Sequence, residues 1–164
     1  MKKWIIGLAS ICLGASMAAG QLIISQYVDT DSGTTPKGLE LWNAGASTID
    51  FSTDGLDILK GVNGGALSSD FTLNTGTLAA GAVMVVGSSD LVAYVGGLGT
   101  GVLTAEKGFS FNGNDALQVQ LNSVVQDTFG TPGVDPGSAW SGSGVSTADQ
   151  NIQLLDGIST DRKS

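Results

Sequence analysis

The chain has 164 residues, with 7 lysines and arginines, 15 aspartates and glutamates, no histidine and one cysteine. This length suits one domain, and a hydrophobic content of 41% with 13% charged residues is typical of a globular protein. The lack of histidine excludes Ser-His and Cys-His catalysis, histidine general bases and zinc sites that contain histidine.

The first twenty residues have the pattern of a secretory signal peptide. Lys2 and Lys3 precede an apolar run over residues 4–13, and small residues follow up to Gly20. The apolar run is shorter than the roughly 20 residues that cross a bilayer, so we expect cleavage of residues 1–20 and no membrane span afterwards. The mature domain, residues 21–164, would be secreted, extracellular or periplasmic. Without Lys2 and Lys3 it has 5 basic and 15 acidic residues, a net charge of −10.

Short strands separated by turns are predicted along the first half of the mature chain. The first has apolar residues on both faces, which is typical of an interior strand. In the second, Leu39 and Leu41 share one face, and core packing is expected for the neighbouring Trp42. Asp54-Gly55 marks a turn between the third strand, residues 49–51, and the fourth strand, residues 56–59. The five expected strands are residues 21–28, 38–43, 49–51, 56–59 and 71–73.

The middle of the chain predicts one buried strand and one short helical turn. Residues 83–86 form a continuous apolar run, as expected at the centre of a sheet. Ser88-Ser89-Asp90 can cap a helical turn over residues 91–94. Residues 96–101 contain four glycines, which favours a loop.

A β-hairpin is the clearest local signal. Residues 116–121 alternate strictly between apolar and polar side chains, Asn122-Ser123 follows as a two-residue turn, and residues 124–129 return the chain. Asn122 tolerates the positive φ that such a turn requires. The pattern as a whole predicts an all-β fold of about 8–9 short strands, arranged as a two-sheet sandwich more readily than as a closed barrel.

One loop has residues of the kind that bind calcium. Asp29 and Asp31, followed by Ser32-Gly33, place alternating carboxylates before a glycine. A full calcium loop needs further oxygen ligands that are missing here, so a plain polar turn is the favoured interpretation and calcium the alternative. Asn112-Gly113-Asn114-Asp115 offers the same two interpretations, and the turn is again favoured.

No residue pattern predicts catalysis or a bound cofactor. Glu40 and Glu106 are the only glutamates, so a paired-carboxylate hydrolase would depend on aspartates that mostly occupy turns. No spacing singles out a Ser-Lys pair, and the glycines of residues 96–99 lack the Gly-Lys-Ser/Thr ending of a phosphate loop. We therefore expect a protein that is not an enzyme.

The charge balance also argues against direct binding to nucleic acid. A domain of net charge −10 has no cationic stripe to displace counterions from phosphates, and Arg162-Lys163 is too small a cluster to change this. Trp140 lies between Pro136-Gly137 and Ser141-Gly142, so we expect it at the rim or in a loop. An exposed contact with a partner is the less favoured role there, and Trp140 is the candidate for a contact surface.

The order of several segments resembles the lamin tail domain family. The matching motifs are an opening strand, an "EL.N" strand, a "vDLSg" turn, an "L.pGg.lvv" segment, an "l.n.GD.i.L" segment and a "vD.fG" strand. In this chain the opening strand is Leu22-Ile23-Ile24-Ser25-Gln26, the "EL.N" strand is Leu39-Glu40-Leu41-Trp42-Asn43 and the "vDLSg" turn is Ile49-Asp50-Phe51-Ser52. The "L.pGg.lvv" segment is residues 78–86, the "l.n.GD.i.L" segment is residues 109–117 and the "vD.fG" strand is residues 125–130.

This resemblance covers residues 21–130, followed by a loop-rich part over residues 131–164. It implies an immunoglobulin-like β-sandwich without shared catalytic residues. It therefore predicts a secreted interaction or scaffolding module whose partner is a protein or an extracellular matrix or surface component. Residues 129–140 and Arg162-Lys163-Ser164 resemble the variant attached to secreted nucleases. The alternative is thus an N-terminal accessory domain of a secreted nuclease or other hydrolase, with the catalytic domain beyond Ser164.

Overall fold

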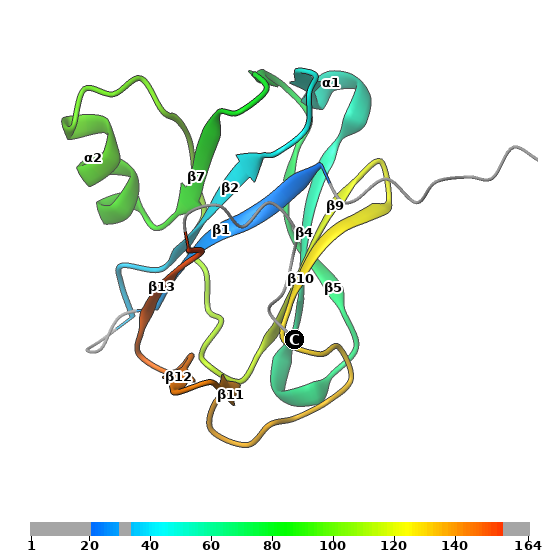
Figure 1. The fold of residues 1–164 in the computed structure, drawn as a ribbon, viewed down its shortest axis with the longest axis vertical. Coiled ribbons are helices and arrows are strands. Elements are labelled where there is room, and N and C mark those ends of the chain that lie inside the picture. The colour runs from blue at the N-terminus through cyan, green and yellow to red at the C-terminus, as the bar shows by residue number, and fades with distance from the viewer. Residues whose placement is uncertain (1–20, 30–33, 156–164) are drawn as a thin grey trace, which may run out of the picture.

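Two β-sheets make up most of the fold (Figure 1), in a computed structural model that describes residues 21–29 and 34–155. The larger sheet has five strands, in the order Asn151–Gln153 (β13), Leu22–Val28 (β1), Gly38–Asn43 (β2), Val83–Gly87 (β7) and Leu103–Glu106 (β8). The second sheet has four, in the order Val124–Phe129 (β10), Ala116–Leu121 (β9), Leu56–Gly61 (β4) and Ser68–Leu73 (β5). The predicted signal peptide lies outside the described residues.

Two small strand pairs and three short helices lie along the chain between the strands of these sheets. The paired strands are Ile49–Asp50 (β3) with Thr77–Leu78 (β6), and Ser141–Gly142 (β11) with Val145–Ser146 (β12). The helices are Phe51–Asp54 (α1), Val62–Gly64 (η1, a 3-10 turn) and Ser89–Gly97 (α2). β7 and β8 are parallel, and α2 makes the crossover that a parallel pair needs. No helix in the described part of the chain is long and apolar enough to span a membrane.

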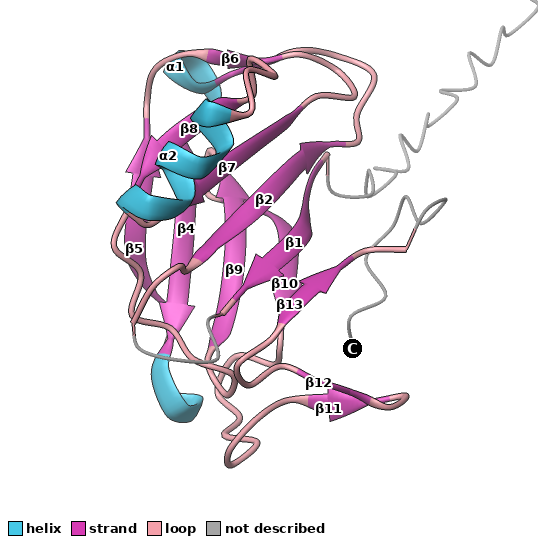
Figure 2. Cartoon of the chain, turned by 90° about the vertical axis from the view of Figure 1, so that its left-hand side faces the viewer, coloured by secondary structure: helices cyan, strands magenta, loops and turns pink. Residues whose placement is uncertain are grey.

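The sheets lie face to face as two layers, with α2 against the outside of the larger one (Figure 2). A single hydrophobic core fills the space between them, because each sheet turns one alternating set of side chains inward. The core residues of the larger sheet are Leu22, Ile24, Tyr27, Leu39, Leu41, Met84 and Val86. Those of the second sheet are Leu56, Ile58, Leu117, Val119, Leu121 and Phe129.

A β-bulge in β1 decides which aromatic side chain enters the core. The pairing of β1 with β2 shifts register between Ile24 and Gln26. Strict alternation would place Tyr27 on the face opposite Ile24, but one extra residue brings both side chains to the core face. Tyr27 is therefore buried between the sheets, where its ring stacks on Phe129 at 4.6 Å between centroids.

The predicted all-β fold is confirmed, and the two main sheets hold nine strands. The hairpin is confirmed as well, with left-handed φ values of 48° at Asn122 and 63° at Ser123. The core placement of Trp42 was wrong. Leu39 and Leu41 take the core face of β2, so Trp42, one residue out of phase, lies half-buried on the outer face beside Val83 of β7.

Two helices also depart from the predicted elements. Phe51, expected in a strand, begins α1, because Asp50 acts as the N-cap and accepts a hydrogen bond from the N–H of Ser52. The single turn expected over residues 91–94 is the nine-residue helix α2. β8 and β13 were not expected, since both are short, neither has a buried residue, and both lack a full alternating pattern.

Candidate functional site

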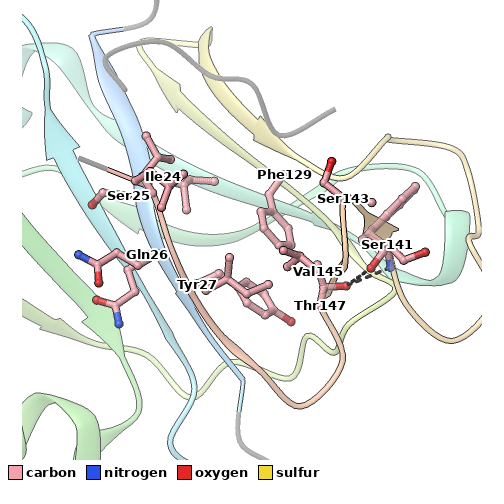
Figure 3. Close-up of a pocket in the computed structure, with 15 residues that line it drawn as sticks. Ile24, Ser25, Gln26, Tyr27, Phe129, Ser141, Ser143, Val145 and Thr147 are labelled. Atoms are coloured by element: carbon pink, nitrogen blue, oxygen red, sulfur yellow. Dashed lines mark hydrogen bonds between the residues drawn. The ribbon is translucent and has the colours of Figure 1, made fainter. Parts of the chain in front are cut away.

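A groove of about 400 Å³ opens between the β1–β13 edge of the larger sheet and the β11–β12 hairpin (Figure 3). One wall comes from Ile24 and Tyr27 of β1 together with Phe129 of β10, and the other wall from the loop around Trp140. None of its lining residues is charged. The remaining lining residues are Ser25, Gln26, Ser141, Gly142, Ser143, Val145, Thr147, Ile152, Gln153, Leu154 and Leu155.

Trp140, the predicted contact residue, is half-buried at this groove. Its ring packs against the hydrophobic core, and its indole N–H donates to the backbone oxygen of Asp115 at 3.1 Å. Its backbone N–H donates to Thr147 Oγ1 at 3.0 Å. A Cβ added at Gly130 would lie 2.5 Å from the indole nitrogen, so only glycine leaves room for the ring. Trp140 thus fixes the loop and lines the groove, while its role as a partner contact stays a prediction.

The Asn112–Asp115 turn holds the loop around Trp140 in place through hydrogen bonds. As the favoured interpretation predicted, the Asp115 carboxylate binds a local backbone group, the N–H of Asn112 at 3.1 Å. Its second oxygen accepts from the N–H of Asn63 in η1 at 3.0 Å. Asn114 adds a hydrogen bond of 2.7 Å to the backbone oxygen of Gly137. The turn therefore ties three loops together.

Asp29, one of the two candidate calcium ligands, is buried and forms an ion pair with Lys37. Its second carboxylate oxygen accepts from the Tyr27 hydroxyl at 3.4 Å and from the backbone N–H of Asp149 at 3.3 Å. Burial, together with the neighbouring carboxylate of Asp29, raises the pKa of the Tyr27 phenol. Asp29 therefore faces the protein interior and not an open loop.

Asp31, the second candidate ligand, lies outside the described residues. Within residues 21–29 and 34–155, no three His, Cys, Asp or Glu side chains gather in a way that could hold a metal ion. Calcium binding stays a prediction. It is checked by the melting temperature in millimolar calcium, because a ligand that binds only the folded state raises it.

A second hollow, of about 590 Å³, lies between α2 and the outer face of the larger sheet. Tyr94 of α2 and Leu98, directly after the helix, line it and are exposed, and Leu39 and Val85 form its floor. Sequence reasoning missed this feature because it predicted only one helical turn here. The apolar side chains among residues 91–98 were the sequence signal that could have indicated an apolar surface here.

The other two lysines of the described residues share one aspartate. Lys107 Nζ lies 3.0 Å from an oxygen of Asp70, and Lys60 Nζ lies 3.6 Å from the other. With Lys37 on Asp29, each described lysine is thus engaged with a carboxylate. This pairing leaves the described surface without a cluster of free cations of the kind that binds phosphates.

Asp127 was noticed in the sequence only as part of a motif. It is buried on β10 and accepts a hydrogen bond of 2.7 Å from the backbone N–H of Ile24 on β1. Its other oxygen accepts from the N–H of Thr128 at 2.8 Å. Asp127 therefore has a structural role, because it accepts a hydrogen bond from a buried backbone N–H of a strand in the opposite sheet.

Comparison of the chain with protein-family models, with curated proteins and with solved structures finds no match.

Proposed function

We propose that this chain is a secreted, non-catalytic interaction module with an immunoglobulin-like sandwich of the lamin-tail type. It binds an extended, uncharged, partly apolar peptide segment of a protein partner outside the cytoplasm. The groove beside β13 carries this proposal, because it combines an apolar lining with a neighbouring sheet edge.

The sheet edge supports a peptide as the occupant. β13 is the terminal strand of the larger sheet, and among the described strands it pairs only with β1. A peptide strand that adds to a sheet edge gains main-chain hydrogen bonds, and pockets beside the edge select alternate side chains. In this chain the groove is the pocket, and Ile152 of β13 lines it from the edge strand itself.

The chemistry of the lining supports the choice of an uncharged segment. The groove is lined by serine, threonine and glutamine side chains together with aliphatic and aromatic ones, and no lysine, arginine, aspartate or glutamate is among them. A charged side chain placed there would lose water without gaining a partner charge. The buried carboxylates of Asp29, Asp115 and Asp127 lie outside the lining and bind groups within the fold.

Peptide selection followed by a matched pair of variants tests the proposal. Peptides are selected from a displayed random library on the intact protein, and the Kd of a synthetic selected peptide is measured by calorimetry. Val145→Ser changes an exposed valine of the groove, and Val124→Ser changes another exposed valine, at the β9–β10 turn outside the groove. We expect Val145→Ser to weaken binding about tenfold, as for loss of one buried apolar side chain, and Val124→Ser to leave it unchanged.

Equal affinities for the two variants would place peptide binding elsewhere, and failure to select any peptide would count against a peptide module. Export is tested separately by the N-terminal sequence of the protein recovered outside the cytoplasm. An N-terminus at or near Gln21 supports secretion, and retention of Met1 in a cytoplasmic protein contradicts it.

A further inference from the structure

The buried pair of Lys37 and Asp29 has the arrangement of two groups placed to react. The Lys37 side chain is 10% exposed and that of Asp29 is 1% exposed, and Nζ contacts Oδ1 directly. Removing two charges from water is unfavourable, and only their mutual attraction and further hydrogen bonds offset this cost. A reaction that removes both charges from the interior would avoid this cost.

The surroundings of the pair are aromatic. Lys37 Nζ lies 5.7 Å from the ring centre of Phe111, whose ring is 5.1 Å from that of Tyr27. Tyr27 in turn stacks on Phe129. These rings belong to the hydrophobic core, so they limit the access of water to the pair.

Each reacting group also has further hydrogen-bond partners that hold it in place. Lys37 Nζ donates to the backbone oxygen of Phe111 at 2.8 Å, which fixes the end of the lysine chain. The oxygen of Asp29 that faces away from the lysine, Oδ2, accepts from the Tyr27 hydroxyl and the Asp149 N–H. These two donors, at 3.4 and 3.3 Å, face the oxygen on which negative charge develops when a nucleophile adds to the carbon, and they would stabilise that charge by moving closer.

We propose that Lys37 and Asp29 condense spontaneously into an amide cross-link between their side chains. A proton first passes from the ammonium to the carboxylate along the contact they share, which leaves an amine and a carboxylic acid. The amine nitrogen then bonds to Asp29 Cγ, and the bond from Cγ to Oδ1 breaks. Oδ1 leaves as water with two protons, so an ammonium and a carboxylate become one amide and one water molecule without any other reactant.

The fold supplies what this reaction needs. Two groups held in contact react as if at an effective concentration of up to about 10⁵–10⁸ M. Negative charge that develops on Oδ2 meets the hydroxyl of Tyr27, and the raised pKa of that phenol keeps its proton in place at physiological pH. The cross-link would close the segment of residues 29–37, which leads from β1 to β2.

Intact mass measurement of the purified full chain tests this inference. We expect the wild-type protein to weigh one water molecule less than its sequence requires, and Lys37→Arg, whose guanidinium does not condense, to show the full mass. Lys60→Arg is the matched control, because Lys60 lies near Asp70 in a less buried ion pair, and it should retain the loss of water. Circular dichroism of Lys37→Arg establishes that the variant is folded.

Peptide mapping locates the lost water and excludes other sources. Asp54-Gly55 and Asp156-Gly157 can lose water to form a succinimide, but Lys37→Arg would share that loss. Trypsin should fail to cleave after Lys37 in the wild type, and the peptide containing both residues should lack one water after mild alkaline treatment. A wild-type chain of full mass that trypsin cleaves after Lys37 would overturn the inference, whether or not the variants fold.

Discussion

The carboxylate of Asp127 accepts a hydrogen bond of 2.7 Å from the backbone N–H of Ile24, although 103 positions separate the two residues. Asp127 lies on β10 in one sheet and Ile24 on β1 in the other. β13 pairs with β1 only over Gln26–Val28, and β10 lies beside β1 as well. The side chain therefore takes the place of a strand partner and fastens the two sheets together.

Replacing this carboxylate should destabilise the whole domain. Asp127→Ala leaves the N–H of Ile24 without its acceptor in a buried position, and we expect a loss of about 1–3 kcal/mol in the free energy of unfolding. Urea denaturation measures it. Asp57→Ala is the control, because Asp57 accepts from the Ser69 hydroxyl on the surface, and its loss should stay within about 0.5 kcal/mol. Equal losses for the two variants would show that the link between the sheets adds no stability.

The contact between Gly130 and Trp140 gives a second prediction. Gly130 has a φ of +74°, and an added Cβ would meet the indole nitrogen at 2.5 Å. Gly133 has a φ of +80° with no atom within 4 Å of such a Cβ. Gly133→Ala should lower the free energy of unfolding by about 1 kcal/mol, because alanine is strained in the left-handed backbone conformation. Gly130→Ala should cost about 1–3 kcal/mol more, because the ring must move.

Thermal or urea unfolding of both alanine variants separates the clash from the backbone effect. Tryptophan fluorescence of folded Gly130→Ala should also shift, since the displaced indole of Trp140 would change its exposure to water. Equal stability of the two variants, with unchanged fluorescence, would mean that the loop around Trp140 makes room for the added Cβ without destabilising the fold.

Local patterns in the sequence predicted the parts of the fold that depend on neighbouring residues. The β9–β10 hairpin was found because strict alternation and a two-residue turn are local signals. The position of Tyr27 was not, because it depends on a bulge that only the pairing with β2 reveals. β8 was missed because it is a short edge strand without an alternating pattern, and its parallel pairing with β7 depends on the crossover helix α2.

The candidate site divides in the same way. Trp140 was singled out because a tryptophan among glycines and serines is unusual, but its anchoring to Asp115 joins segments 25 positions apart and leaves no local signal. Asp29 was chosen for its spacing from Asp31. The neighbour that changes its chemistry, Lys37, is eight positions away and was not connected with it.

The pH dependence of stability should carry a contribution from Asp50. The hydroxyl and the backbone N–H of Ser52 donate to its carboxylate and lower its pKa from the ordinary value of 3.8. A lowered pKa in the folded state means that the contribution is present above pH 3.8 and is lost as the pH falls through the folded value. Asp50→Asn keeps an acceptor for the N-cap but does not titrate. The stability difference between the wild type and this variant should therefore shrink on acidification, and a constant difference would contradict the assignment.

Asn43 should tolerate substitution least among the polar residues of β2. Its side chain is fully buried, and its Nδ2 donates to the backbone oxygens of Ser47 and Leu78 at 2.9 Å each, while Oδ1 accepts from the N–H of Gly45 at 3.0 Å. Asn43→Asp preserves the shape but replaces both donors with an oxygen that faces two carbonyls.

We expect this exchange to lower the free energy of unfolding by about 2–4 kcal/mol, because the buried carbonyl of Leu78 and the partly buried carbonyl of Ser47 lose their donor and a carboxyl group enters a buried site. Asn74→Asp, at an exposed position, should change stability by less than about 0.5 kcal/mol. Urea denaturation at neutral pH compares the two. If Asn43→Asp were as stable as Asn74→Asp, the hydrogen bonds from the Asn43 side chain to the backbone oxygens of Ser47 and Leu78 would add no stability to the fold.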